Sequence, residues 1–249
     1  MPRTRLYIDG RYGTGSELQL DADRSRYLTR VLRLRSGDSL LVFNGGGDEF
    51  SATMLNAGKN SATLRIDEQT VAQTESKLRV HLVQGISRGE RMDFVVQKAT
   101  ELGIKRITPV LTEYGVVKLD SGRAEKRRDH WQKVAASACE QCGRVRLPLV
   151  EAPVTLKEWF GSAPANVDAQ LILKPGAAMP LAAISAPPTK VCLLIGPEGG
   201  FRDNEYEDAE VVGFRPVAIG PRILRTETAA IAALAILQSL WGDLGSSGL

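Results

Sequence analysis

VCLLIGPEGGF, residues 191–201, is the stretch that decides the fold. Its apolar residues Val191–Ile195 predict a buried strand, and the glycine-rich segment that follows leads into a helical stretch at Asp203–Val212. A strand that passes through a short loop into a helix is the repeating unit of α/β proteins. Glycines in such a loop let the backbone approach a ligand. The loop has neither dinucleotide-fingerprint spacing nor a P-loop lysine, so a plain strand-to-helix turn explains it equally well.

The same alternation continues on both sides of this stretch. Further strands are predicted at 78–84, 107–111, 169–173 and 216–219, and further helices at 91–102, 124–142 and 226–241. Strands separated by helices predict an α/β fold with a mostly parallel sheet that is covered on both faces. Ligands of such sheets bind beyond the carboxyl ends of the strands. We therefore expect a site at the loops after Leu173, Ile195 and Ile219.

The first 70 residues have a different texture, with short alternating runs broken by turn residues. Leu40–Phe43 and Phe50–Met54, separated by an Asn-Gly-Gly-Gly turn, predict a hairpin. Several such strands without a long helix predict a small β-barrel. The polar segment 69–76 is the predicted linker. The expected domains are thus a barrel at 1–70 and an α/β domain at 77–246.

The loop after Ile219 places two arginines and a glutamate at the start of an apolar helix. Thr226 and Glu227 suit a helix start for capping reasons alone. Arg222 and Arg225 do not, because positive side chains oppose the helix dipole there. Each is expected to have an anionic partner, which could be RNA phosphate, a cofactor carboxylate, Glu198 or Glu227.

Composition narrows the class of protein. The chain has 249 residues and a formal net charge of +3. Five arginines with no intervening acid lie between Arg24 and Arg35, and a second basic cluster runs from Arg123 to Arg146; such stripes can bind phosphates or be solvated faces. Three cysteines and no apolar leader predict an intracellular protein, expected in the cytoplasm. The longest apolar stretch is shorter than the ~20 residues that span a membrane. Cys139 and Cys142 lack a second ligand pair, so we expect packing or surface roles and no metal.

LLIGPEGGF (Leu193–Phe201) followed by IGPRILRTETAA (Ile219–Ala230) resembles the SPOUT superfamily of methyltransferases. More narrowly, it is similar to the RsmE-type enzymes that methylate N3 of a uridine in small-subunit ribosomal RNA. The likeness extends over nearly the whole chain in the family's order. It includes RVLRLRSGD (30–38), SRGERMDFVVQKATELGI (87–104), VVKLD (116–120) and WQKVAASACEQCGR (131–144).

The resemblance implies S-adenosylmethionine as cofactor, a deep trefoil knot in the C-terminal domain, a PUA-like RNA-binding barrel and a homodimer. A knot is an exception among protein folds. The implied partner is small-subunit ribosomal RNA, free or in the assembled subunit. The implied cofactor residues are Leu173, Ile195, Gly196, Pro197, Glu198, Gly199, Gly200, Ile219, Gly220, Pro221, Leu224, Thr226 and Thr228. Members of this family often carry Ser where this chain has Arg202; we expect Asp203 to cap the helix instead, moving its start by one residue.

Methyl transfer to N3 requires positioning of the two partners and loss of the N3 proton. The catalytic candidates are Arg225 and Glu227, as a cation beside the anionic base or as a proton acceptor. Glu198 is equally compatible with a structural role, paired to Arg222 or Arg225. The uridine is expected to be unpaired or extruded. The predicted RNA-binding residues are Arg24, Arg26, Arg30, Arg33, Arg35, Arg88 and Arg222.

Two alternatives compete with a methyltransferase. One is a non-catalytic RNA-binding or ribosome-assembly protein, which needs no cofactor; two glycine loops that each follow a buried strand favour a cofactor pocket over it. The other is an α/β enzyme that uses a different nucleotide, against which the missing P-loop and dinucleotide patterns argue.

Overall fold

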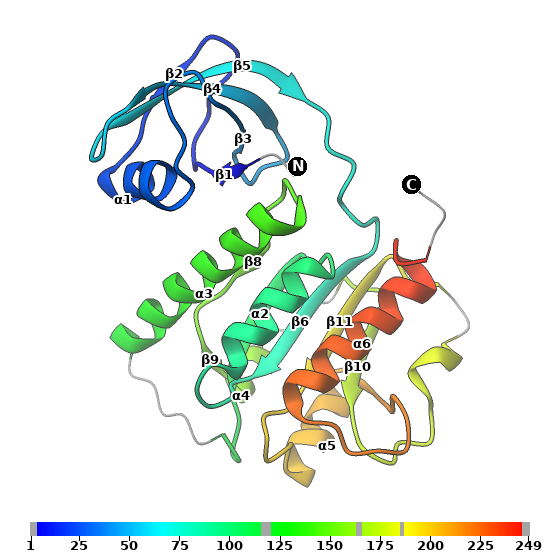
Figure 1. The fold of residues 1–249 in the computed structure, drawn as a ribbon. Helices are drawn as coiled ribbons and strands as arrows, with labels where there is room; N and C mark the ends of the chain where they lie inside the picture. Colours follow the sequence, from blue (N-terminus) through cyan, green and yellow to red (C-terminus); the bar gives the residue numbers. More distant parts are fainter. Residues whose placement is uncertain (1–3, 116–120, 163–165, 185–186, 246–249) are drawn as a thin grey trace. The chain divides into compact units, whose positions relative to one another are not determined.

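A computed structural model describes residues 4–115, 121–162, 166–184 and 187–245 (Figure 1). The chain divides into two compact units. Unit 1 consists of residues 1–75 and 139–147, and unit 2 of residues 76–138 and 148–249. The VVKLD segment (116–120) quoted above lies outside the described residues. Every helix that the structure describes is too short or too polar to span a lipid bilayer.

Unit 1 is built on a curled sheet. Within the described residues its five strands have the order β1-β3-β4-β5-β2. They are β1 (Arg5–Tyr7), β2 (Glu17–Gln19), β3 (Ser39–Phe43), β4 (Glu49–Ala57) and β5 (Ala62–Thr70). Alternate residues of β4 and β5, among them Met54 and Leu64, point into a closed apolar core. The predicted hairpin is confirmed: β3 and β4 pair antiparallel, and Asn44 Oδ1 accepts the backbone N–H groups of Gly46 and Asp48 in the turn.

Two short helices of unit 1 were not predicted. They are α1 (Ala22–Arg26) and the π-helix η1 (Tyr27–Val31). Asp21 caps α1 by accepting the Arg24 N–H at 2.7 Å, and Leu28 of η1 is fully buried in the core. After η1 the chain turns through Arg33, whose φ of 57° lies in the left-handed region. These helices carry Arg24, Arg26 and Arg30 of the predicted arginine cluster, and Arg33 and Arg35 follow η1.

The end of α3 (Ser121–Cys142) and the loop after it belong to unit 1. Cys139 is buried with Phe43 and Val145 in a small apolar cluster, which confirms its packing role. Glu140 Oε1 accepts the Tyr7 N–H at 2.9 Å. The chain therefore returns to unit 1 at residues 139–147, which a single predicted linker at 69–76 does not account for.

Unit 2 contains a parallel sheet. Among the described residues its strands run in the order β12-β10-β11-β6-β7-β8, with β9 also paired to β7, and every pairing is parallel. The strands are β6 (Arg79–Gly85), β7 (Arg106–Leu111), β8 (Leu149–Val150), β9 (Val154–Thr155), β10 (Ala169–Leu173), β11 (Lys190–Ile195) and β12 (Arg215–Val217). The prediction of an α/β fold with a mostly parallel sheet is confirmed.

Helices cover both faces of this sheet (Figure 1). The helices are α2 (Arg91–Glu101), α4 (Leu156–Phe160), α5 (Asp203–Val211) and α6 (Thr226–Trp241), with the 3-10 turn η2 (Leu181–Ala183). Cys192 and Leu194 of β11 pack against α4 and α5 through Trp159 and Tyr206. Their neighbours in β11 point to the other face, where α2 and α6 lie. Both faces are therefore covered, as predicted.

Two sequence-based expectations at strand and helix ends were wrong. The strand predicted at 216–219 ends at Val217, because Ala218 leaves it to bridge Pro180 and Ile219 turns into a cavity. The helix α5 starts at Asp203 with Arg202 as its N-cap, so Asp203 does not cap it. Half of a capping box is kept, because Glu205 Oε2 accepts the Arg202 N–H at 2.8 Å. The Arg202 side chain instead pairs with Glu113 at 2.6 Å.

Candidate cofactor pocket and active site

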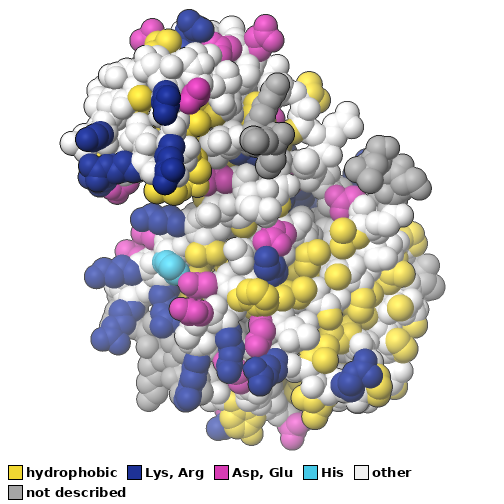
Figure 2. All heavy atoms as spheres, in the orientation of Figure 1, with side chains coloured by type: hydrophobic (Ala, Val, Ile, Leu, Met, Phe, Trp, Pro, Cys, Tyr) yellow, Lys and Arg dark blue, Asp and Glu magenta, His cyan; other side chains and the backbone are white. Residues whose placement is uncertain are grey.

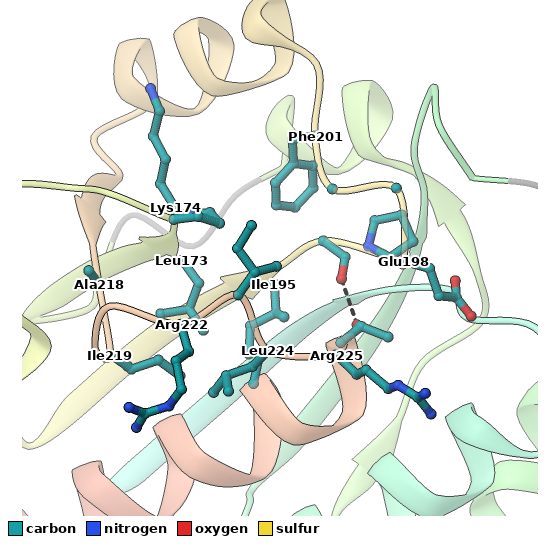
Figure 3. A pocket seen from close by; sticks show the side chains of 18 of the residues that line it. Leu173, Lys174, Ile195, Glu198, Phe201, Ala218, Ile219, Arg222, Leu224 and Arg225 are labelled. Carbon is teal, nitrogen blue, oxygen red and sulfur yellow. Dashed lines mark hydrogen bonds between the residues drawn. The ribbon is translucent and has the colours of Figure 1, made fainter.

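A cavity of about 550 Å³ opens at the carboxyl ends of β10, β11 and β12 (Figure 3). Its size is typical of small-molecule sites, about 300–1,000 Å³. The loop after β11 forms one wall and the segment between β12 and α6 forms another. Leu173, Ile195 and Leu224 turn toward its centre, whereas the charged ends of Glu198, Arg222 and Arg225 turn outward (Figure 3). The predicted location, beyond the ends of these three strands, is where the cavity lies.

Most of the residues predicted to bind the cofactor come together in this cavity. They are Leu173, Ile195, Gly196, Pro197, Glu198, Gly199, Gly200, Ile219, Gly220, Leu224 and Thr226. Pro221 and Thr228 are exposed and are not among the lining residues. The structure adds lining residues that sequence reasoning missed, among them Arg91, Lys174, Phe201, Tyr206 and Val217. Contact of any of them with a cofactor stays a prediction.

A buried polar network holds the two loops together. The Thr226 hydroxyl donates to the Gly196 carbonyl at 2.6 Å, drawn as the dashed line in Figure 3, and accepts from Gln84 Nε2 at 2.9 Å. Thr226 is 5% exposed and Gln84 is fully buried, so water does not compete for these bonds. Thr226 therefore lines the cavity but uses its hydroxyl to fix the loop after β11.

Glu198 is tied to the start of α2 and not to the arginines that sequence reasoning named. Its Oε1 accepts from the Arg88 backbone N–H at 3.0 Å and from Arg91 Nη1 at 2.6 Å. Burial by itself would raise the pKa of Glu198, but hydrogen bonds from backbone N–H groups and from Arg91 outweigh it and lower that pKa. The predicted pairing with Arg222 or Arg225 was wrong; Arg91 takes that place.

Arg222 and Arg225 line the cavity and are both exposed. In the part of the chain that the structure describes, no ion pair joins either guanidinium to a carboxylate. The expectation that Glu198 or Glu227 is their partner is thus not met. An anion from outside the chain, RNA phosphate or a cofactor carboxylate, stays as the predicted partner.

Glu227 lies in the first turn of α6 and is mostly buried, with a side-chain exposure of 14%. Its Oε1 is 4.0 Å from Arg91 Nε, and its buried Oε2 has no hydrogen-bond partner among the described residues. Glu227 is not among the cavity-lining residues, whereas Arg91 is. Arg91 could have been found from the sequence, because it is a positive residue at the start of a predicted helix, as Arg225 is.

Comparison with known proteins places this geometry in a family. A sequence model described as an RNA methyltransferase domain matches residues 74–238, and one described as an RNA methyltransferase PUA domain matches residues 20–67. Ribosomal RNA small subunit methyltransferase E from Buchnera aphidicola subsp. Acyrthosiphon pisum is 33% identical over 96% of this chain and 94% of its own. The enzyme of that name from Buchnera aphidicola subsp. Schizaphis graminum is 35% identical over 96% and 97%. The chain belongs to the RNA methyltransferase family of ribosomal RNA small subunit methyltransferase E.

Solved structures of this family have the same fold. The Neisseria gonorrhoeae ribosomal RNA small subunit methyltransferase E bound to S-adenosyl methionine is 37% identical, with a TM-score of 0.90 over 97% of this chain and 99% of its own. A Legionella pneumophila methyltransferase in complex with the same cofactor is 40% identical, with a TM-score of 0.93 over 98% and 100%. The match of residues 20–67 to the PUA domain model confirms the PUA-like class expected for the N-terminal domain.

The residues of this chain fit S-adenosylmethionine, the cofactor of the family. Apolar walls suit an adenosyl group, and the backbone groups of residues 219–224 have no hydrogen-bond partner among the described residues. Gly200 and Gly220 have φ values of 71° and 132°, which are strained for other residues. A side chain on Gly196 would meet Gly200 Cα at 3.1 Å and Phe201 at 3.3 Å. The loops therefore present backbone groups to the cavity.

The predicted RNA-binding arginines of unit 1 are not equivalent. Arg24 pairs with Asp21 at 2.8 Å, and Arg26 pairs with Asp23. Arg30, Arg33 and Arg35 are exposed and form no ion pair with the described residues. Lys and Arg side chains gather on one face of unit 1 (Figure 2). Arg88 of unit 2 is also exposed, with its backbone N–H bound to Glu198. Contact of these residues with RNA stays a prediction.

Proposed function

We propose that this protein transfers a methyl group from S-adenosylmethionine to N3 of a uridine in small-subunit ribosomal RNA. One observation carries the proposal: a cavity at the carboxyl ends of three parallel strands, enclosed by the loop after β11 and by residues 219–224, whose backbone groups have no hydrogen-bond partner among the described residues. Family membership and the cofactor named for two similar structures support it. When bound, the cofactor supplies an electrophilic methyl group on a sulfonium.

The cavity-lining residues that were predicted from the sequence bind the cofactor, and Pro221 and Thr228 lie just outside the cavity wall. Thr226 acts by holding the Gly196 carbonyl in place. The loop that Glu198 fixes to α2 excludes water from one side of the cavity. We also propose that the two domains are residues 1–70 and 77–246. We propose in addition a trefoil knot around this site.

For the reaction we assign Arg225 and Glu227 as catalytic residues. Arg225 is an unpaired cation at the mouth of the cavity, suited to an anionic base. Glu227 has a carboxylate oxygen without a partner, suited to accept the N3 proton, once the substrate reaches it past Arg91. Arg222, exposed at the rim, steers phosphate.

We also propose that the protein is a homodimer that buries the outer face of α6. The helix is apolar nearly all round, and such a helix is normally buried on all sides. Leu240, Leu244, Phe94 and Ile223 are 45%, 41%, 45% and 86% exposed. Apolar side chains form a broad patch over α6 in Figure 2. Sedimentation equilibrium should show a dimer for the protein and a monomer for Leu240→Glu; a monomeric parent protein rejects this part of the proposal.

The reaction is tested with methyl-labelled S-adenosylmethionine and purified ribosomal subunits that lack base methylation. Small subunits should take up about one methyl group each, and large subunits none. Naked small-subunit RNA is the second substrate, and its uptake of label decides whether free or assembled RNA is methylated. We also propose a cytoplasmic location, which is compatible with both substrates. No uptake by any substrate, together with no cofactor binding in calorimetry, would reject the proposal in favour of a non-catalytic RNA-binding protein.

A further inference from the structure

Arg91 is a cavity-lining cation at the start of α2. It is the first residue of α2, where its charge opposes the helix dipole. Its guanidinium lies between two carboxylates, with Nη1 at 2.6 Å from Glu198 Oε1 and Nε at 4.0 Å from Glu227 Oε1. These contacts explain why a positive side chain is tolerated at the start of a helix.

The same contacts leave one edge of the guanidinium without a partner. Arginine has five N–H donors in a fixed plane. Glu198 accepts a hydrogen bond from Nη1 and Glu227 lies beside Nε at 4.0 Å, whereas Nη2 has no hydrogen-bond partner among the described residues. The Arg91 side chain is 44% exposed and belongs to the cavity wall. Its free donors are therefore available to a molecule bound there, and its position is set from two elements, the loop after β11 and the start of α6.

We propose that Arg91 donates from Nη2 to a carbonyl oxygen of the target uracil, with Glu198 as its positioning residue and the catalytic Glu227 on its other side. This inference rests on the proposed function. When N3 loses its proton, negative charge spreads to the neighbouring carbonyl oxygens, and a fixed guanidinium stabilises charge that develops there. Arg91 thus acts in the transition state more than in substrate binding.

The proposed step moves one proton and one methyl group. The bond between N3 and its proton breaks, and the proton passes to Glu227, the acceptor proposed above. A bond forms from N3 to the methyl carbon as the bond from that carbon to sulfur breaks, with its electron pair leaving on sulfur. Arg91 exchanges no atom. It holds its charge beside the uracil oxygen while the other charges move.

The test compares Arg91→Met, which removes the charge, with Arg91→Lys, which keeps the charge but loses the planar donors. Arg106→Met is the matched control, because Arg106 is also a half-exposed arginine paired with a glutamate, Glu151 at 3.4 Å, and it begins β7 at the opposite end of the sheet. Single-turnover methylation of small subunits is measured at saturating cofactor and substrate, with the dissociation constant for S-adenosylmethionine from calorimetry.

Arg91→Met should lower the single-turnover rate by about 10²–10³-fold, the usual effect of losing one such donor, with cofactor affinity unchanged. Arg91→Lys should recover part of the rate, and Arg106→Met should match the parent protein. The deficit of Arg91→Met should narrow as the pH rises into the range where uridine N3 ionises in solution. A role confined to folding would give a pH-independent deficit.

Three outcomes would overturn the inference: an unchanged rate in Arg91→Met, a deficit that is equal at every pH, or a loss that appears only in cofactor affinity or KM. Arg91→Lys keeps the inference testable if Arg91→Met does not fold, because it should then still show a reduced rate with normal cofactor affinity. Failure of the parent protein to form 3-methyluridine would reject the proposed function instead, so the two failures are distinguishable.

Discussion

Gly85, the last residue of β6, packs directly against the loop after β11 and leaves no room for a Cβ atom. A Cβ placed on it would lie 2.4 Å from Pro197 Cδ and 2.5 Å from the Pro197 nitrogen. The nitrogen is backbone and cannot move without moving the loop after β11. The close approach of this loop to β6 therefore requires glycine at position 85.

Gly85→Ala should reduce the free energy of unfolding by about 1–3 kcal/mol, the usual effect of overpacking. It should also weaken S-adenosylmethionine binding, because the displaced loop carries cavity-lining residues. Urea unfolding and calorimetry measure the two effects. Gly13→Ala is the control, since a Cβ there meets nothing within 4 Å. Equal stability and equal cofactor affinity for both variants would contradict the packing argument.

His81 in β6 makes the stability of unit 2 depend on pH. Burial, with a smaller contribution from Arg106, lowers the pKa of His81 from 6.5 to about 3. Between these values the unfolded chain binds a proton that the folded protein does not, so the free energy of unfolding falls as the pH decreases from 6.5. The parent protein should lose up to about 1.4 kcal/mol per pH unit more than His81→Gln over this range. Parallel pH profiles in urea unfolding would show that His81 titrates normally.

Individual side-chain partners were the part of the site least open to prediction from the sequence. The loops were identified from their glycines and from the arginines at the mouth of α6. The partner of Glu198 was not, because Arg91 is 107 positions away and no local pattern encodes such a pair. Glu227 likewise looked like a capping residue or a catalytic one, and only the structure places its oxygen beside Arg91.

At the scale of elements, the start of α5 is fixed to the loop after β7 by one buried carboxylate. Glu205 is 6% exposed, and its two oxygens accept the backbone N–H groups of Arg202 at 2.8 Å and Glu113 at 2.9 Å. Without it, two part-buried N–H donors would lose their carboxylate partner. Glu205 thereby sets where α5 begins behind the cavity wall.

Glu205→Ala should lower the free energy of unfolding by about 2–3 kcal/mol, because hydrogen bonds to a charged group are worth about 1.5–3 kcal/mol and the donors are left unpaired. Glu207→Ala removes an exposed glutamate from the same helix and should change stability by less than about 0.5 kcal/mol. Thermal and urea unfolding measure both. A Glu205→Ala variant as stable as Glu207→Ala would exclude the anchoring role.

Elements with a strong apolar period were predicted almost to the residue, and short ones were missed. The strand at Ala169–Leu173 and the helix at Thr226–Trp241 have the predicted bounds. The two-residue strands β8 and β9 contain less than one full alternation, so a pattern cannot identify them. The π-helix at Tyr27–Val31 has five residues, too few to show an apolar period, and is held by tertiary packing of Leu28.

At the scale of the whole molecule, we expect the unpaired arginines of unit 1 to contribute most to RNA affinity. Replacing Arg30, Arg33 and Arg35 together by Gln should lower the slope of log affinity against log salt by about 2–3, since each lost phosphate contact removes about 0.7–0.9. The double variant of Arg24 and Arg26 should lower it by less, because Asp21 and Asp23 already neutralise them. Binding titrations at several salt concentrations measure the slopes. Equal slopes in both variants would contradict this ranking.

The most direct test of the account is the identity of the methylated nucleoside. Small ribosomal subunits that lack base methylation are incubated with the protein and labelled S-adenosylmethionine, and the RNA is digested to nucleosides and resolved by chromatography with mass spectrometry. We expect the label in 3-methyluridine alone. Label in a uridine methylated at carbon 5 or on the ribose, or in any other nucleoside, would contradict the assignment of N3 while leaving the methyltransferase family intact.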